Sequence, residues 1–280
     1  MLAIALAFAS SLAWGSADFM GGLQSRRRSL IAVLLIAQLM ALALGAMYVL
    51  AAGDPFPDPG PALLAFGAGL GGCLALAAFY RGLAIGTMSI VAPVSATGAA
   101  VPVLVGIAEG ERPGEIQVAG IALALVGIVM AAREPGGAAP SRAVRASIGL
   151  ALLAALGFGS FFVLIDAATE RGGAPWSLFI VRIAEALLLG AVALALKPGM
   201  PRSLRDASPL LLIGALDYAA TALFALATRE GLLSIVSVVG SLYPAVTVVL
   251  ARIVLAERVA RSQEIGVVVT LAAVVAISAG

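Results

Sequence analysis

Three polar side chains lie close together in an otherwise apolar stretch of the chain. Asp217, Tyr218 and Thr221 supply a carboxylate, a phenol and a hydroxyl within about one helical turn. Such groups could bind the ammonium and the carboxylate of a small polar solute. A carboxylate that pairs only with a neighbouring helix would fit the same pattern equally well, so both interpretations stay open at this point.

Several kinds of chemistry are excluded by the residues that the sequence lacks. There is no histidine, which excludes HExxH zinc sites, histidine-ligated haem and imidazole-dependent triads. The single cysteine, Cys73, lies in an apolar run, which argues against a disulfide framework and a thiolate metal site. The single lysine, Lys197, precedes Pro198, so there is no phosphate-binding loop of the GxxxxGK[ST] type. We expect no catalytic residue, no cofactor and no metal ion.

The composition identifies the environment in which the polar residues work. Of the 280 residues, 62% are hydrophobic and 11% are charged, and the mean hydropathy is +1.11. Soluble domains average about 45–50% apolar and about 25% charged residues. A soluble sphere of this size could not cover so much apolar surface. A soluble enzyme, a nucleic-acid-binding protein and a disordered chain are therefore excluded.

The apolar residues form stretches long enough to cross a bilayer, which requires about 20 residues in a helix. They predict an all-α integral membrane protein with ten transmembrane helices. The first stretch lacks the charged start of a signal peptide and is expected to remain as a helix. The expected helices cover residues 2–21, 29–52, 61–80, 88–108, 116–132, 147–166, 177–196, 208–228, 234–254 and 264–279.

Short motifs recur along the chain at a nearly constant spacing of about 145 residues, which indicates an internal duplication. We predict two halves, residues 1–137 and 138–280, with five helices each. The recurring motifs are Trp14-Gly15-Ser16 and Phe158-Gly159-Ser160, Gln38 and Arg182, residues 86–91 and 231–236, and Glu111-Arg112 before Gly120 and Glu257-Arg258 before Gly266.

An odd number of helices in each half makes the second half enter the membrane from the opposite face. The repeat is therefore predicted to be inverted, as in many secondary transporters. Equivalent loops support this, because residues 53–61 carry two aspartates and no basic residue whereas residues 197–209 carry three basic residues. Thirteen of the 17 basic residues collect on one face. By the positive-inside rule this face is cytoplasmic, and both termini lie outside.

Charged groups inside the expected helices need partners, since an ionised side chain at the bilayer centre costs about 2.5–3.5 kcal/mol on insertion scales. Arg182 and Glu185 are three residues apart and can pair on one helical face. We interpret this pair as structural. Asp18 and Asp166 lie near the ends of their expected helices, where a side chain can reach the interface.

Aromatic, serine and proline residues complete the candidate site. Trp14 and Phe158 are related by the repeat, and equivalent positions of an inverted repeat converge near the axis where transporters place their sites. Most aromatic side chains in membrane helices simply face lipid or neighbours, so only this pair is favoured as a pocket wall. Proline frees a backbone carbonyl but is also tolerated for packing alone. Further candidates for the lining are Tyr80, Phe161, Tyr243, Ser16, Ser95, Ser160 and Ser241, and for gates in the fourth and ninth helices Pro93, Pro102 and Pro244.

These motifs resemble the EamA-type members of the drug/metabolite transporter superfamily. The resemblance rests on Trp14-Gly15-Ser16, Arg182, Tyr243-Pro244, Glu257-Arg258 and Gly266. It implies a ten-helix transporter that moves small metabolites, often outward, with amino-acid exporters among its members. Gln38 departs from the family, where an arginine is common, and so do the acidic residues 53–61. Relatives are drawn with cytoplasmic termini, opposite to the orientation that the charges predict here.

Together, these features predict a secondary transporter that works by alternating access and exports neutral or aromatic amino acids and similar small metabolites. We expect a monomer in the inner membrane of a bacterial cell, with a small-molecule substrate, the lipid bilayer around it and no nucleic-acid partner. The alternative is a membrane-embedded enzyme or a lipid scramblase, of which the missing histidine excludes most hydrolases and metal enzymes.

The charge asymmetry yields a testable orientation, with residues 26–28 and 197–205 facing the cytoplasm. In a Cys73→Ala background, a cysteine at Asp58 should react with an impermeant thiol reagent added to intact cells. A cysteine at Ser203 should stay protected. The opposite labelling pattern would reverse the orientation while leaving the inverted repeat intact.

Overall fold

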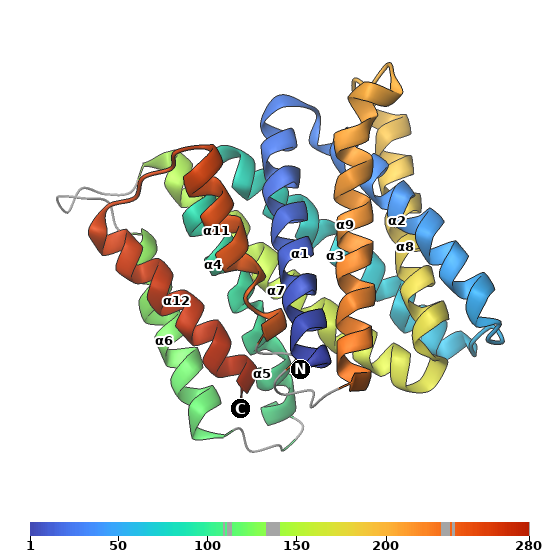
Figure 1. The fold of residues 1–280 in the computed structure, drawn as a ribbon, viewed down its shortest axis with the longest axis horizontal. Helices are drawn as coiled ribbons and strands as arrows, with labels where there is room; N and C mark the ends of the chain where they lie inside the picture. The colour runs from blue at the N-terminus through green and yellow to red at the C-terminus, as the bar shows by residue number, and fades with distance from the viewer. Residues whose placement is uncertain (109, 111–113, 133–140, 231–235, 237–238, 280) are drawn as a thin grey trace.

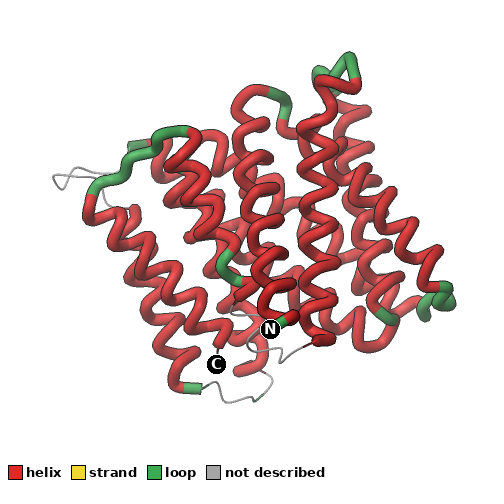
Figure 2. The backbone as a smooth tube through the Cα atoms, in the orientation of Figure 1, coloured by secondary structure: helices red, strands yellow, loops and turns green. Residues whose placement is uncertain are grey.

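The computed structural model describes residues 1–108, 110, 114–132, 141–230, 236 and 239–279, and these residues form helices and loops without a strand (Figure 2). Helices follow one another with short connections, as expected for a membrane bundle. The helices are α1 (Leu2–Arg27), α2 (Leu30–Ala52), α3 (Pro59–Ile85), α4 (Met88–Ala96), the 3-10 turn η1 (Thr97–Ala99), α5 (Ala100–Ala108), α6 (Glu115–Ala132), α7 (Arg142–Gly172), α8 (Ala174–Leu196), α9 (Leu204–Glu230), α11 (Tyr243–Val254) and α12 (Arg261–Ala279).

These helices confirm the predicted all-α membrane fold. Among the described residues, 8 helical segments are long and apolar enough to span a bilayer, with Met88–Ala108 counted as one. The segments Glu115–Ala131 and Tyr243–Val254 are shorter and apolar, and complete the ten predicted spans. Several helices run beyond the expected limits, because hydrogen bonding continues where charged side chains enter the headgroup region.

The fourth and ninth predicted helices are both interrupted. The fourth changes to a 3-10 turn at Thr97–Ala99, and residues 241–242 form a turn directly before α11. Residues 234–235 and 237–238 of the ninth lie outside the described residues. Pro102 and Pro244 lie beside the two breaks, where each lacks the N–H of an intrahelical hydrogen bond. Because the two breaks occupy equivalent positions of the repeat, they are a common feature of both halves. Discontinuous helices of this kind are common at the binding sites of transporters.

Contacts between helices relate the two halves by an approximate two-fold axis. The α1–α9 contact corresponds to the α7–α3 contact, α3–α8 corresponds to α9–α2, and α1–α11 corresponds to the contacts of α7 with η1 and α5. The pairs α2–α8 and α6–α12 each join a helix to its own counterpart. Figure 1 shows α2 and α8 at one side of the bundle, α6 and α12 at the other, and α1, α3, α7 and α9 between them. The halves therefore interleave.

Glycine residues allow the interleaved helices to approach each other closely. A Cβ atom at Gly69 in α3 would lie 2.6 Å from the carbonyl oxygen of Val181 in α8. At the equivalent place in the other half, a Cβ atom at Gly214 in α9 would clash with the carbonyl oxygen of Ala37 in α2. Small residues at such crossings are typical of membrane helices, where close packing replaces the hydrophobic effect.

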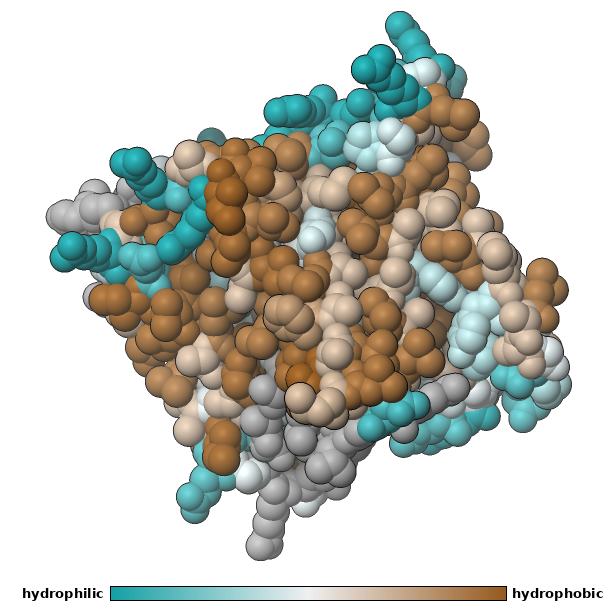
Figure 3. All heavy atoms as spheres, viewed as in Figure 1, coloured by the Kyte–Doolittle hydropathy of each residue, from teal (hydrophilic) through white to brown (hydrophobic). Residues whose placement is uncertain are grey.

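The loops of one end of the bundle are basic. Arg28 lies 3.8 Å from Asp206, and Arg26 donates hydrogen bonds to the carbonyls of Leu83 and Gly86. The α1–α2, α3–α4 and α8–α9 connections therefore share this end, which we call the basic end. Both termini lie at the opposite end (Figure 1). Figure 3 shows apolar side chains over the face of the bundle and hydrophilic ones gathered at its ends, as a membrane-spanning protein requires.

Because α2 and α9 cross closely, we expect any side chain at position 214 to destabilise the protein. Gly214→Ala should lower the free energy of unfolding by about 1–3 kcal/mol, because the added methyl group meets the Ala37 backbone. Thermal unfolding of the purified protein in detergent measures this loss. Gly190→Ala, in α8, is the matched control because a Cβ there meets nothing within 4 Å. Equal stability of the two variants would contradict the close crossing.

Candidate functional site

Arg182 of α8 is the centre of a polar cluster inside the bundle. Its Nη1 donates hydrogen bonds to Glu185 Oε2 and to Gln38 Oε1 of α2, both at 3.0 Å. Its Nη2 lies 2.9 Å from Oδ2 of Asp217 in α9. These four residues, which we call the axial cluster, join three helices from both halves.

The axial cluster marks the two-fold axis of the repeat. Gln38 and Arg182 are equivalent positions of the two halves, and a residue meets its own counterpart only on the axis. The counterparts of Glu185 and Asp217 are the small, buried residues Ala41 and Gly72. All charges of the cluster therefore come from the second half, and the symmetry is broken electrostatically at its centre.

The two carboxylates of the cluster differ in how firmly they are held. The Glu185 side chain is 5% exposed and accepts a hydrogen bond from Arg182. The Asp217 side chain is 27% exposed, and its Oδ2 accepts no hydrogen bond from the described residues although Arg182 is within ion-pair distance. Glu185 is thus the fixed counter-ion of the guanidinium, and Asp217 is the partner that a competing anion could replace.

Among the described residues, the other two polar residues singled out on α9 make no hydrogen bond to a side chain of the axial cluster. The Thr221 hydroxyl donates to the carbonyl of Asp217 in its own helix at 3.0 Å. The Tyr218 ring lies beside Gly45 of α2, where a Cβ atom would be 3.6 Å from the ring and 3.4 Å from Phe179. Both residues are half-buried, and their role in binding stays a prediction.

Aromatic residues form two clusters related by the repeat. Trp14 of α1 lies 5.7 Å from Phe224 of α9, and its counterpart Phe158 of α7 lies 5.7 Å from Phe79 of α3, measured between ring centroids. Trp14 also contacts Tyr243 at 6.2 Å. The ring contacts thus place Trp14 and Phe158 in separate clusters, and the single wall suggested by their equivalence is divided in two.

The glycine after each of these aromatic residues explains the recurring motif. A Cβ atom at Gly15 would lie 2.5 Å from the carbonyl oxygen of Tyr243, and one at Gly159 would lie 2.5 Å from that of Gly98. Both carbonyls lie at the breaks of the ninth and fourth helices. The glycines therefore seat the opening helix of each half directly against an interrupted helix of the other half.

The remaining candidates occupy varied places. The exposed Ser160 donates to the Leu156 carbonyl of its own helix at 2.8 Å, and the buried Ser95 donates in the same way to Ala92. Phe161 packs against Gly72 of α3. The structure places the rest as follows: Tyr80 buried beside Phe79, Ser16 half-buried in α1, Ser241 in the turn before α11, Pro93 buried inside α4, Pro102 in α5 and Pro244 in the first turn of α11.

Asp18 was expected at the membrane interface, and the structure corrects this. Helix α1 continues past it to Arg27, so the carboxylate lies within the helix. Its side chain is half-buried in the bundle. The apolar window ended the expected helix too early, because it counted the polar final turns as loop. The spacing of one helical turn from Trp14 was the available signal.

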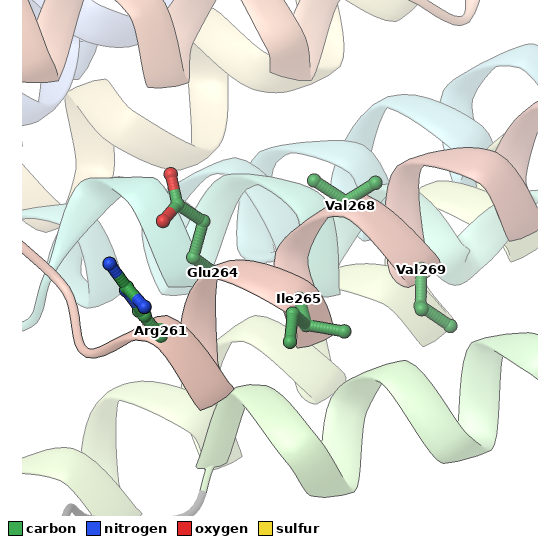
Figure 4. A pocket seen from close by; sticks show the side chains of 5 residues that line it. All are labelled: Arg261, Glu264, Ile265, Val268 and Val269. Carbon is green, nitrogen blue, oxygen red and sulfur yellow. The ribbon is translucent and has the colours of Figure 1, made fainter.

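Two further features bear on the site. A shallow depression lies along α12, lined by side chains of that one helix (Figure 4). Its residues Ile265 and Val268 are exposed on the bilayer-facing surface, so it is a lipid contact and contains no member of the axial cluster. The residues that line this depression are Arg261, Glu264, Ile265, Val268 and Val269. The recurring Glu111-Arg112 and residues 231–235 lie outside the described residues.

Ten apolar helices in an interleaved inverted repeat, with a charged cluster on its axis, define a multi-pass membrane transporter. The model of the EamA-like transporter family matches residues 1–133 and 145–279, and the chain belongs to this family. The resemblance of its motifs is thereby confirmed, and the family consists of transporters rather than enzymes. No curated protein matches the sequence. Sixteen chains of solved structures match, and one of them is a crystal structure with a TM-score of 0.66 and 16% identity over 98% of this chain and 95% of its own.

The axial cluster predicts a strong coupling between Arg182 and Glu185. Arg182→Ala leaves a buried carboxylate without its partner and should lower the free energy of unfolding by about 3–5 kcal/mol, and the double variant with Glu185→Ala should recover part of this. Unfolding in mixed detergent micelles measures both. Breaking the exposed Arg252–Glu264 pair by Arg252→Ala is the control, at about 1 kcal/mol or less. A double variant less stable than either single one would contradict the pairing.

Proposed function

We propose that this transporter exports neutral and aromatic amino acids and similar small metabolites by alternating access, in the inner membrane of a bacterial cell. The observation that carries the proposal is the unequal pairing of Arg182. Its Nη1 is held by Glu185 and Gln38, whereas its Nη2 forms an ion pair with Asp217, whose side chain is 27% exposed. A cation and an anion side by side in a low-dielectric interior match the two charges of a zwitterion.

An amino acid would enter the axial cluster by replacing one ion pair with two. Its ammonium would bind Asp217, and its carboxylate would take the position that Asp217 leaves at Nη2 of Arg182. Charge-assisted hydrogen bonds of this kind are shorter and about twice as strong as neutral ones. Tyr218 and Thr221 would add donors near the carboxylate. The net charge of the interior stays unchanged, which makes the exchange feasible at membrane depth.

The aromatic cluster of α1 and α9 would receive the side chain of the substrate. Phe224 lies two helical turns after Asp217, on the same face of α9, which corresponds to about 10 Å along the axis. Trp14 and Tyr243 complete this cluster. Apolar walls beside a charged anchor favour aromatic and large neutral side chains, and stacking adds about 0.5–1.5 kcal/mol. Phe158 and Phe79, with Tyr80 beside Phe79, would form the equivalent wall in the other half.

The interrupted fourth and ninth helices would act as the moving parts. These helices contain or adjoin three prolines, Pro93, Pro102 and Pro244. Because a proline has no N–H, the backbone hydrogen bond at its position is already missing, and the helix can bend there without breaking one. Since Gly15 and Gly159 seat α1 and α7 against these breaks, a tilt of either opening helix would change the access to the axial cluster. A monomer contains all of these parts.

The proposal predicts that Asp217 is needed for transport but not for folding. Asp217→Asn should reduce the counterflow of labelled phenylalanine in proteoliposomes about tenfold, because it removes a charge-assisted hydrogen bond worth about 1.5–3 kcal/mol. Asp166→Asn, at an exposed carboxylate of α7, is the matched control and should leave counterflow unchanged. Lipid translocation without amino-acid counterflow in the native protein would support the scramblase instead.

Trp14 should determine which side chains are preferred. Trp14→Ala removes the ring that contacts Phe224 and Tyr243, so counterflow of phenylalanine should fall more than that of alanine. Competition assays in proteoliposomes measure the ratio of the two. An unchanged ratio, together with full activity of Asp217→Asn, would rule out the proposed cavity and leave the fold untouched.

A further inference from the structure

Glu257, in the connection between α11 and α12, is bound by two other segments at the basic end, the end of α1 and the start of α4. Its Oε1 accepts hydrogen bonds from the backbone N–H of Met88 at 3.1 Å and from Nη2 of Arg26 at 3.2 Å. Its Oε2 accepts from the N–H and the hydroxyl of Ser89, both at 3.0 Å. The side chain is 12% exposed. We call these four residues the Glu257 latch.

Arg26 extends the latch to the α3–α4 connection. Besides Glu257, its guanidinium donates to the carbonyl of Leu83 at 3.1 Å and to that of Gly86 at 3.0 Å. The end of α1, the end of α3, the start of α4 and the segment after α11 are therefore tied together. Three of these segments belong to the first half and one to the second, so the latch joins the halves across this end.

The start of α4 depends on Glu257 for its cap. The first N–H groups of a helix have no partner within the helix, and they favour a negative charge. The N-cap residue of α4, Thr87, makes no side-chain hydrogen bond to them. The cap comes instead from the other half of the chain, so it is lost whenever the two halves separate at the basic end.

The backbone beside Glu257 adopts a conformation that side chains disfavour. Ala256 has a φ of +51°, in the left-handed region that residues other than glycine rarely occupy. Such a backbone conformation persists only where surrounding contacts hold it in place. Here the hydrogen bonds of the adjacent Glu257 side chain provide these contacts. Release of the latch would relieve this conformation, which makes the open arrangement easier to reach.

A buried apolar plug lies directly inside the latch. Leu83 and Met88 are each 0% exposed, and a Cβ atom at Gly22 of α1 would meet both side chains. The backbone N–H of Met88 belongs to the latch, and the carbonyl of Leu83 accepts a hydrogen bond from Arg26 of the latch. While the latch is closed, these side chains separate the water at the basic end from the interior.

We propose that the Glu257 latch is the gate at the basic end, and that it must open for substrate to pass between this end and the axial cluster. The inference rests on alternating access, the mechanism proposed above, and adds the residues that close one side. Arg26 and Glu257 lie at the water boundary, where ion pairs are weakened by solvent and salt. A gate needs contacts of this kind, which hold the closed state and still break within a transport cycle.

The test measures the accessibility of the plug. A Met88→Cys reporter in a Cys73→Ala background keeps the backbone N–H of the latch, and a maleimide should label it slowly in nanodiscs. Glu257→Gln removes the charge and one acceptor oxygen, and should raise the labelling rate about tenfold, as expected for one charge-assisted hydrogen bond. Ser89→Ala, which removes one of the four hydrogen bonds, should give a smaller rise and serves if Glu257→Gln folds poorly.

Two controls separate a gate from a structural cap. Glu264→Gln breaks the Arg252–Glu264 pair at 2.8 Å, which joins α11 to α12 within one half, and should leave the labelling rate unchanged. A Thr270→Cys reporter, at a buried position of α12, should stay unreactive in the Glu257→Gln variant. An unchanged rate at position 88, or an equal rise at position 270, overturns the gate. Because labelling needs no substrate, a positive result without amino-acid counterflow would contradict only the proposed substrate.

Discussion

A guanidinium in the middle of a membrane protein constrains everything around it. Arginine stays charged at any pH at which the protein is folded, so Arg182 must be satisfied by fixed acceptors. It obtains them from Gln38, Glu185 and Asp217, on three helices. These contacts set the rotation of α2, α8 and α9 about their own axes, and they bring the two halves into register at the repeat axis.

The halves depend on each other for a core. Most of the extensive helix contacts run between a helix of one half and a helix of the other, in symmetric pairs. In lipid, apolar side chains gain little by leaving the solvent, so close backbone contact at glycines such as Gly69 and Gly214 supplies the packing. An interleaved bundle of this type can open at one end only if the halves part there, which is where the Glu257 latch joins them.

The packing of the helices is symmetric in this protein, whereas the distribution of charge is not. Packing features are duplicated, as the equal 5.7 Å ring distances of Trp14–Phe224 and Phe79–Phe158 show. Charge is not duplicated, since Asp217 has Gly72 as its counterpart. A repeated scaffold can alternate between two related shapes, whereas one charged site is enough to bind one small substrate. The structure therefore combines a symmetric frame with an asymmetric centre.

The sequence by itself determined the class of the protein. Each transmembrane helix must be apolar on its own, so it can be recognised from about 20 consecutive residues. It likewise revealed the inverted repeat and the i, i+3 partner of Arg182. Only the tertiary structure decided that Gln38 touches its own counterpart, that Asp217 joins the cluster, that Trp14 and Phe158 belong to separate ring clusters and that α1 continues well past Asp18. Those outcomes depend on the rotation and depth of each helix, which are set by packing between distant small residues and leave no local pattern in the chain.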